Sequence, residues 1–332
     1  MLNIGIVGLG NVGRGVLAAI RKMPDLTAEI VWTRRPEQVE KELKKQSIFA
    51  LVQDSKDFSL PKGMNVDVAI LCGGSKEDTL IQGPEFARHF NTVDSFDTHK
   101  KIPDYFAKMD IAAKENNNVS VISAGWDPGI FSLMRLLGEA FLPRSENYTF
   151  WGRGISQGHS NAARKVEGVK DARQYTIPIE EAVQQVRSGE TPKFSTREMH
   201  KRLVYVVSEE GADEKKIVEA IVTMPDYFDE YDTEVVFITK EQMEREHASF
   251  PHGGFVFTIG TTGEDDKNRQ ILEYRCTLMD NPEFTSSVLI ACARAAYRLK
   301  EKGKSGAVTM LDIPPALYSP HSVKDVQRRF FM

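Results

Sequence analysis

The stretch Gly8-Leu9-Gly10-Asn11-Val12-Gly13 decides the fold. It follows a short apolar run at residues 4–7 and opens a helical stretch over about residues 11–22. A G-x-G-x-x-G between a strand and a helix is typical of a dinucleotide-binding turn. Its glycines permit the tight turn, the approach of the pyrophosphate and close helix–strand packing. The alternative, a merely structural glycine-rich turn, is disfavoured because the motif lies in the first βα turn of the chain.

The start of the predicted helix offers free N–H groups and a positive dipole end to phosphates. We therefore predict that the cofactor is bound there by Gly8, Gly10, Asn11, Val12 and Gly13.

Strand-like and helix-length segments alternate through the first part of the chain. Further apolar runs lie at residues 28–32, 66–72, 92–94 and 119–123, and a helix-length segment lies at residues 102–115. This alternation favours a parallel, doubly wound α/β sheet of the Rossmann type. We assign residues 1–125 to this dinucleotide-binding domain. The C-terminal segment, about residues 300–332, is expected to pack back on it, since a lone terminal helix would expose its apolar face.

The pattern changes after Gly129. Partly alternating runs lie at residues 148–151, 203–208, 234–239, 255–259 and 271–278, before a long helix at about residues 285–302. Glycine- and aspartate-containing loops after residue 259 indicate antiparallel connections. We predict an α+β substrate-binding and dimerisation domain with a largely antiparallel sheet over residues 126–299.

The end of the second predicted strand indicates which dinucleotide binds. NAD sites usually carry an acid about 20 residues after the glycines, to bind the ribose 2′-hydroxyl. Here Trp32 is followed by Thr33, Arg34 and Arg35, and no carboxylate occurs before Glu37. A hydroxyl and two guanidiniums suit a 2′-phosphate, so we predict NADP(H). The alternative is that the two arginines are a solvated loop pair.

Two acidic segments follow later strands. Asp97 lies in the segment at residues 93–99, and Asp127 lies in the segment at residues 123–129. Ligands of doubly wound sheets bind beyond the carboxyl ends of the strands, so these carboxylates are candidates for holding an ammonium group and for proton transfer. The alternative is that both aspartates cap turns, since Asp-Pro-Gly after Trp126 is good turn chemistry.

Composition excludes other classes. A net charge of −4 gives no reason to expect a nucleic acid or a membrane surface as partner. The three cysteines lack zinc-ligand spacing, and no H-E-x-x-H or G-x-S-x-G occurs, so we predict no metal site and no hydrolase. No apolar run is long enough to span a membrane, and Met1 leads directly into a strand. We expect a cytoplasmic protein.

Nine segments spread over nearly the whole chain form a further pattern: residues 4–14, 33–35, 72–75, 94–99, 125–129, 150–152, 156–160, 224–228 and 251–254. In these segments the chain resembles the meso-diaminopimelate dehydrogenases. Lys76, Glu77, Asn161 and Lys165 depart from the family pattern.

The resemblance implies reversible, NADP-dependent oxidative deamination at the D-carbon of meso-2,6-diaminopimelate, giving L-2-amino-6-oxopimelate, ammonia and NADPH in the lysine pathway. It implies that Asp97 and Asp127 are catalytic, and that the protein is a homodimer. The implied substrate-binding residues are Trp126, Trp151, Gln157, Gly158, Thr176, Arg202, His252 and Asn281. The implied further cofactor contacts are Cys72, Gly73, Gly74, Ser75, Ser95, Gly125, Pro128 and Gly129.

Taken singly, the middle-domain residues have simpler explanations: His252 and Asn281 as turn residues, and Trp151 as core. Two other functions stay open. One is another NADP-dependent dehydrogenase of the aspartate and lysine pathways, and the other is a non-catalytic NADP-sensing regulator.

Overall fold

The computed structural model describes residues 1–74 and 77–331, so the predicted cofactor residue Ser75 and the departure Lys76 lie outside the described residues. The chain divides into two compact units, one of Met1–Leu133 with the chain from Pro282 onward, the other of Met134–Asn281. Within the described residues no helix has both the length and the apolar character needed to cross a membrane.

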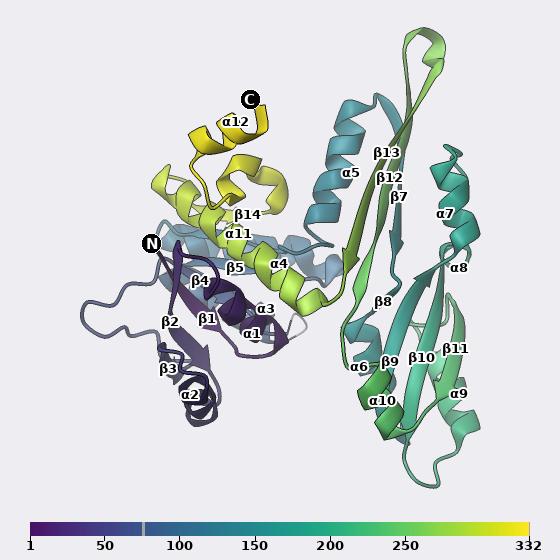
Figure 1. Cartoon of the computed structure of the whole chain (residues 1–332), viewed down its shortest axis with the longest axis horizontal. Coiled ribbons are helices and arrows are strands. Elements are labelled where there is room, and N and C mark those ends of the chain that lie inside the picture. Colours follow the sequence, from purple (N-terminus) through teal and green to yellow (C-terminus); the bar gives the residue numbers. More distant parts are fainter. Residues whose placement is uncertain (75–76, 332) are drawn as a thin grey trace. The chain divides into compact units, whose positions relative to one another are not determined.

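The first unit is built on a seven-stranded sheet whose strands all pair in parallel, in the order β14-β6-β5-β4-β1-β2-β3 (Figure 1). The strands are β1 (Leu2–Val7), β2 (Leu26–Thr33), β3 (Leu51–Asp54), β4 (Val68–Leu71), β5 (Asn91–Asp94), β6 (Val119–Val121) and β14 (Gly306–Val308). The predicted doubly wound sheet is confirmed. Its order reverses at β1, which pairs with β2 on one side and β4 on the other.

Alternate strand residues pack on opposite faces of this sheet, as the strand period of two requires. Ile4 and Ile6 belong to one core cluster, and Val7 belongs to another. The unit's α-helices are α1 (Asn11–Ile20), α2 (Pro36–Lys45), α3 (Asp78–His89), α4 (Ile102–Glu115), α11 (Asn281–Glu301) and α12 (Val323–Phe331). Apolar residues of α1, α2 and α11 belong to the cluster that contains Ile4. Those of α3 and α4 belong to two other clusters, one of which contains Val7. Short 3-10 turns are η1 (His99–Lys101), η3 (Met310–Asp312) and η4 (Pro315–Tyr318).

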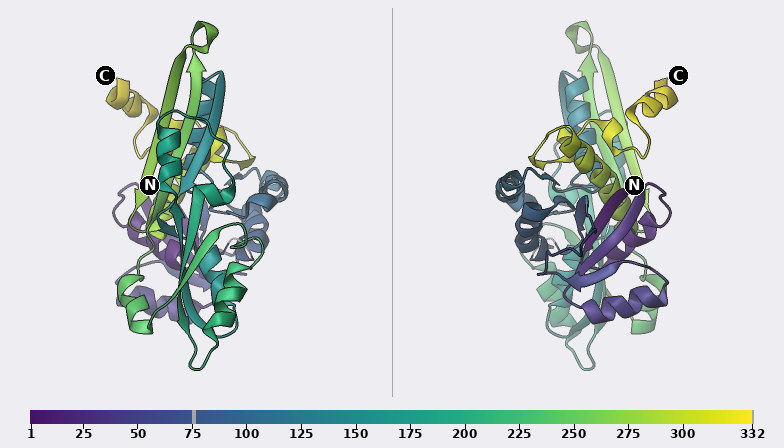
Figure 2. Two further views of the ribbon diagram at one scale, coloured as in Figure 1. Left: turned by 90° about the vertical axis from the view of Figure 1, so that its right-hand side faces the viewer. Right: turned by 90° about the vertical axis from the view of Figure 1, so that its left-hand side faces the viewer.

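The second unit holds two sheets (Figure 2). Its strands are β7 (Arg144–Trp151), β8 (Gly154–Ile155), β9 (Val169–Pro178), β10 (His200–Ser208), β11 (Asp232–Phe237), β12 (His252–Thr262) and β13 (Asn268–Leu278). One sheet has the order β11-β10-β9-β8 and the other β13-β12-β7. Every pairing is antiparallel except that of β10 with β11, so the largely antiparallel character is confirmed, in two sheets rather than one.

Helices pack on both sheets of this unit. Helices α6 (Gln157–Arg164) and α9 (Glu214–Val222) pack on the four-stranded sheet, and α7 (Glu180–Arg187) packs on the three-stranded sheet. The remaining elements are α8 (Thr196–Met199), α10 (Lys240–Glu246) and the turn η2 (Glu264–Asp266) between β12 and β13.

The division of the chain differs from the predicted boundaries at 125 and 299. Helix α5 (Ile130–Phe141) crosses the first division, and all of α11 beyond Asn281 belongs to the first unit. The physical reason is burial, because Val288, Leu289, Cys292 and Ala296 of α11 join the core of β1 and α1. The chain after α11 returns to the same sheet, where β14 pairs with β6.

Candidate active site

The glycine-rich turn has the geometry that a dinucleotide requires. Gly8 has φ +88°, and a Cβ added at Gly13 would lie 2.1 Å from the Gly8 carbonyl oxygen. A Cβ at Gly10 would meet no described heavy atom within 4 Å beyond its immediate neighbours. Gly8 and Gly13 are therefore needed by the fold, and the open space at Gly10 lets a ligand approach the backbone.

Helix α1 begins directly after Gly10, with Asn11 and Val12 as its first residues. Among the described residues no side chain caps this end, and the first turn carries no acid. Its N–H groups and positive dipole end therefore suit a phosphate.

The strands that carry the predicted cofactor residues end at one edge of the sheet. The Gly8 N–H donates to the Trp32 carbonyl oxygen at 2.8 Å, and the Cys72 N–H donates to the Val7 carbonyl oxygen at 2.8 Å. The ends of β2, β1 and β4 thus lie side by side at the point where the strand order reverses. Crevices at such points are the usual ligand sites of open α/β sheets.

Arg34 and Arg35 are exposed at the end of β2, whereas Thr33 is buried and its Oγ1 accepts the N–H of Arg35 at 3.2 Å. The Arg34 guanidinium forms an ion pair with Asp78 at 3.2 Å. Asp78 also accepts the N–H of Gly74 at 3.3 Å, so it connects two predicted cofactor-binding loops. The sequence-based prediction missed Asp78, because no helix was predicted at α3, whose first turn carries this acid.

The two acidic segments are neighbours in the first unit. The Ala124 N–H donates to the Asp94 carbonyl oxygen at 2.8 Å, joining the chain beyond β6 to the end of β5. Asp97 is exposed and Asp127 is partly buried. Trp126 is buried with its ring edge-on to Phe131, at a centroid distance of 5.1 Å.

The turn that bears Asp127 is tight. Trp126 and Gly129 form a β-bridge around Asp127 and Pro128. A Cβ at Gly129 would lie 2.1 Å from the Gly125 carbonyl oxygen, so the turn depends on glycine at 129. Asp127 therefore lies in a tight turn, as the turn-capping alternative expects for its backbone.

In the second unit, sheet register brings Thr176, Arg202 and His252 together. Thr176 of β9 lies opposite Arg202 of β10 and also opposite Gly154 of β8. The Arg202 guanidinium donates to the Thr176 hydroxyl. A Cβ at Gly154 would lie 2.5 Å from the His252 Cα, so the small Gly154 allows the start of β12 to approach Thr176. The predicted substrate residues of β9, β10 and β12 therefore lie close together.

Trp151 ends β7 and rests against His200, a buried residue that the sequence-based prediction did not assign to the site. The Trp151 N–H donates to His200 Nε2 at 2.9 Å, and the two rings stack at a centroid distance of 5.2 Å. Burial, aided by the nearby Arg202 charge, lowers the pKa of His200 to about 3. The imidazole is therefore neutral at physiological pH, as its acceptor role requires.

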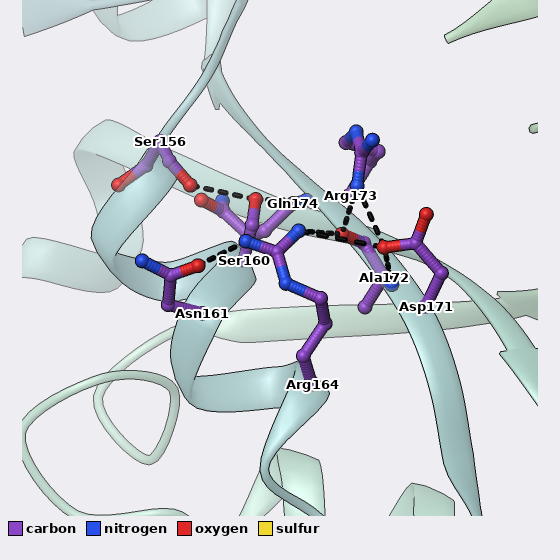
Figure 3. Close-up of polar contacts among 8 residues, drawn as sticks. All are labelled: Ser156, Ser160, Asn161, Arg164, Asp171, Ala172, Arg173 and Gln174. Atoms are coloured by element: carbon purple, nitrogen blue, oxygen red, sulfur yellow. Dashed lines mark hydrogen bonds and ion pairs between the residues drawn. The ribbon is translucent and has the colours of Figure 1, made fainter. Parts of the chain in front are cut away.

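Gln157 and Gly158 open helix α6, which is fixed to β9 at both ends. Near its start, Ser160 Oγ donates to the Ser156 carbonyl oxygen at 2.7 Å and accepts the Gln174 N–H at 2.9 Å. At its other end Arg164 reaches the Ala172 carbonyl oxygen at 3.0 Å (Figure 3). The departure Asn161 accepts a hydrogen bond from Arg164 and lies on the exposed side of the helix. These contacts attach α6, and with it Gln157 and Gly158, to β9, the strand that carries Thr176.

Asn281 is attached to the same unit through its backbone. Its N–H donates to the Phe250 carbonyl oxygen at 2.9 Å, two residues before His252. The predicted residues therefore form two groups, one at the sheet edge of the first unit and one in the second unit.

The parallel sheet with its glycine turn, joined to a second α+β unit, defines a dehydrogenase of two-unit build. The chain is 53% identical to the meso-diaminopimelate D-dehydrogenase of Ureibacillus thermosphaericus, over 98% of each chain. It belongs to the meso-diaminopimelate D-dehydrogenase family.

Other comparisons agree with this assignment. The family model described as the diaminopimelic acid dehydrogenase C-terminal domain matches residues 125–280. The Corynebacterium glutamicum DAP dehydrogenase, solved in complex with DAP, is 41% identical with a TM-score of 0.90 over 99% of each chain. An engineered D-amino acid dehydrogenase bound to NADP+ is 38% identical, with a TM-score of 0.83 over 99% of each chain.

Proposed function

We propose that the protein catalyses the reversible, NADP-dependent oxidative deamination of the D-centre of meso-2,6-diaminopimelate. The products are L-2-amino-6-oxopimelate, ammonia and NADPH. The observation that carries the proposal is the likeness, over 99% of each chain, to a DAP dehydrogenase solved with DAP. The geometry of both units supplies residues with the chemistry that this reaction needs.

The cofactor is assigned to the sheet edge of the first unit. Its pyrophosphate is held at the start of α1 by Gly8, Gly10 and the following residues, and its 2′-phosphate by the side chains of Thr33, Arg34 and Arg35. The structural relative with bound NADP+ supports this preference. The exposed Arg34–Asp78 pair is worth no more than about 1 kcal/mol, so a phosphate dianion competes with Asp78 for the guanidinium.

Asp97 and Asp127 are assigned to the reacting amino group. When bound, a nicotinamide would supply the hydride acceptor that the reaction needs. The substrate ammonium must lose protons before its carbon can be oxidised, and a carboxylate is a suitable acceptor, directly or through water. The carboxylate can then assist the water that releases ammonia.

The other end of the substrate is assigned to Thr176, Arg202, His252 and Asn281, with Trp126, Trp151, Gln157 and Gly158 in contact with its length. Arg202 has no ion-pair partner among the described carboxylates, and burial lowers the pKa of its guanidinium. A buried cation of this kind suits a carboxylate from a ligand. Fixing the L-configured end allows only the D-carbon to present its hydrogen for transfer.

The proposal also covers the role of each unit, the cellular location and the oligomeric state. We assign dinucleotide binding to the first unit, and substrate binding and dimerisation to the second, in a cytoplasmic homodimer. The edge strand β13 supports a second copy as partner, because Ile271 and Leu272 are 41% and 40% exposed there.

NADPH formation with meso-, LL- and DD-diaminopimelate, measured side by side, tests the function. We expect rapid turnover of the meso isomer, weak turnover of the DD isomer and none of the LL isomer. Equal rates with the LL isomer would contradict the stereochemical assignment. Turnover of hydroxy acids alone would favour another dehydrogenase, and NADPH binding without turnover of any substrate would favour a regulator.

A further inference from the structure

Asp94, the last residue of β5, is wholly buried and connects three elements. Its Oδ1 accepts the backbone N–H of Phe96 at 2.9 Å and that of Ser123 at 3.0 Å. Its Oδ2 accepts the Tyr105 hydroxyl of α4 at 2.8 Å. Three donors from three separate parts of the chain therefore meet on one carboxyl group.

Two of these donors belong to the loops of the proposed catalytic residues. Phe96 directly precedes Asp97, and Ser123 begins the segment that ends in the tight turn around Asp127. The backbone reinforces the join, because the Ala124 N–H donates to the Asp94 carbonyl oxygen at 2.8 Å. Asp94 thus fixes the start of both loops relative to each other, although it touches neither Asp97 nor Asp127 through a described hydrogen bond.

Asn91, at the opposite end of β5, is a comparable buried polar residue that lies away from the proposed catalytic loops. Asn91 is also buried and also connects β5 to its neighbours. Its Oδ1 accepts the Val119 N–H at 2.9 Å, and its Nδ2 donates to the Asp67 carbonyl oxygen at 2.7 Å. At the edge where the loops emerge, the residue is instead an acceptor on both oxygens, which suits three converging donors.

We propose that Asp94 is a positioning residue for the reaction, which holds the loops of Asp97 and Asp127 in the separation that the substrate's amino group requires. This inference rests on the proposed roles of those two aspartates. A displacement of about 1 Å in such a pair costs on the order of 10²-fold in rate. The competing explanation is that Asp94 only stabilises the fold.

Four variants of the full-length protein separate these explanations. Asp94→Ala removes the shared acceptor, and Asp94→Asn keeps one oxygen for the two N–H groups while its amide faces Tyr105. Tyr105→Phe removes only the third donor. Asn91→Ala is the matched control, because it breaks a buried join of the same strand at the other edge. The readouts are Tm, kcat, KM and the isotope effect on kcat with substrate deuterated at the reacting carbon.

We expect Asp94→Ala to lower kcat roughly 10²-fold and to raise the isotope effect. Asp94→Asn and Tyr105→Phe should stay within a few-fold of the wild type. Asn91→Ala should lose a similar amount of Tm with a normal kcat and an unchanged isotope effect. If Asp94→Ala does not fold, Asp94→Thr, with a single shorter acceptor, is expected to show the same loss in smaller measure.

A normal kcat in folded Asp94→Ala, or in Asp94→Thr where the former does not fold, would overturn the inference. An equal loss of kcat in Asn91→Ala would overturn it as well. If Asp97→Asn and Asp127→Asn lose turnover while Asp94→Ala keeps it, only this inference fails. If instead those two variants keep normal turnover, the proposed catalytic roles fail whatever Asp94→Ala shows.

Discussion

The guanidinium carbon of Arg202 lies 3.8 Å from the centroid of the Tyr231 ring. Arg202 is 6% exposed, and its Nε has no hydrogen-bond partner among the described residues. A guanidinium over an aromatic face can still direct N–H donors outward in its own plane, and here one of them donates to the Thr176 hydroxyl. The Tyr231 ring and the Thr176 hydroxyl therefore hold the guanidinium ready for an incoming carboxylate.

Replacing Arg202 with alanine should damage turnover of meso-diaminopimelate far more than turnover of D-alanine, because D-alanine has no distal carboxylate. Losing a hydrogen bond to a charged group costs about 1.5–3 kcal/mol, so kcat/KM for the long substrate should fall about 10- to 100-fold. His252→Ala should show the same preference. Steady-state kinetics with both substrates measures it.

Arg173→Ala is the control for Arg202→Ala. Arg173 lies in β9 opposite Tyr205, so its side chain is on the other face of the sheet from Arg202. Arg173→Ala should leave the ratio of kcat/KM for meso-diaminopimelate to kcat/KM for D-alanine unchanged. A parallel loss with both substrates in Arg202→Ala would show that Arg202 is structural.

Tyr231→Ala should raise the KM for meso-diaminopimelate and leave kcat nearly unchanged, whereas Tyr231→Phe should be close to normal. A partly desolvated cation–π contact contributes about 0.5–2 kcal/mol, so the rise should be about 2- to 30-fold. A fall in kcat with unchanged KM would contradict this role for the ring.

Replacing both Arg34 and Arg35 with alanine should raise the KM for NADP at least about tenfold, since each lost charge-assisted bond costs roughly 1.5–3 kcal/mol. Weak activity with NAD should hardly change, because NAD has no 2′-phosphate. The matched control is Arg88→Ala, an arginine that pairs with Glu85 and Glu115 at the other end of α3. Equal loss with both cofactors would refute the assignment.

Asp97→Asn and Asp127→Asn preserve shape and remove charge. A group that moves a proton in the transition state contributes about 10²–10⁴-fold, so at least one variant should lose that much turnover. The NADP affinity and the Tm of both variants should stay close to those of the wild type. Asp104 is an exposed aspartate of α4, so the control variant Asp104→Asn should behave as wild type. Normal turnover in both folded variants would remove the pair from the mechanism.

Asp94 should make stability depend on pH. Burial raises the pKa of Asp94 to about 6 from its ordinary value of 3.8, although three hydrogen bonds oppose the rise. The folded protein then binds more protons than the unfolded chain between about pH 4 and pH 6, so this residue's contribution to the free energy of unfolding falls as pH rises through that window. At about 1.4 kcal/mol per pKa unit, the ionised group costs on the order of 3 kcal/mol.

Asp94→Asn cannot ionise and should escape this cost. The Tm of the variant relative to the wild type should therefore increase from about pH 4 to about pH 6 and level off above. Thermal melts across this range measure the difference. A difference that stays constant with pH would show that Asp94 does not titrate in this window.

Local patterns in the sequence determined β1, β2, β4, β5 and β6 of the first unit, together with helices α1, α4 and α11, whereas β3, β14, α2 and α3 were not predicted. The run before Gly8, the glycine motif and the helix after it are contiguous, and buried parallel strands are continuous apolar runs that need no partner to be recognised. Helix α4 was predicted with both of its observed ends. The same local signals placed Asp97, Asp127 and the arginines at strand ends, and resemblance added the middle-domain residues.

Only the tertiary structure decided how polar strands pair and which buried groups support the site. β9 was not predicted, because Lys170, Asp171, Arg173 and Gln174 interrupt its apolar pattern. It is a strand because β10 satisfies its backbone on one side and α6 covers its small residues. The roles inferred for Asp94, His200 and Tyr231 likewise depend on contacts with residues distant in sequence. Contacts across tens of residues leave no periodic trace in a single chain, and their register is fixed only when the sheets form.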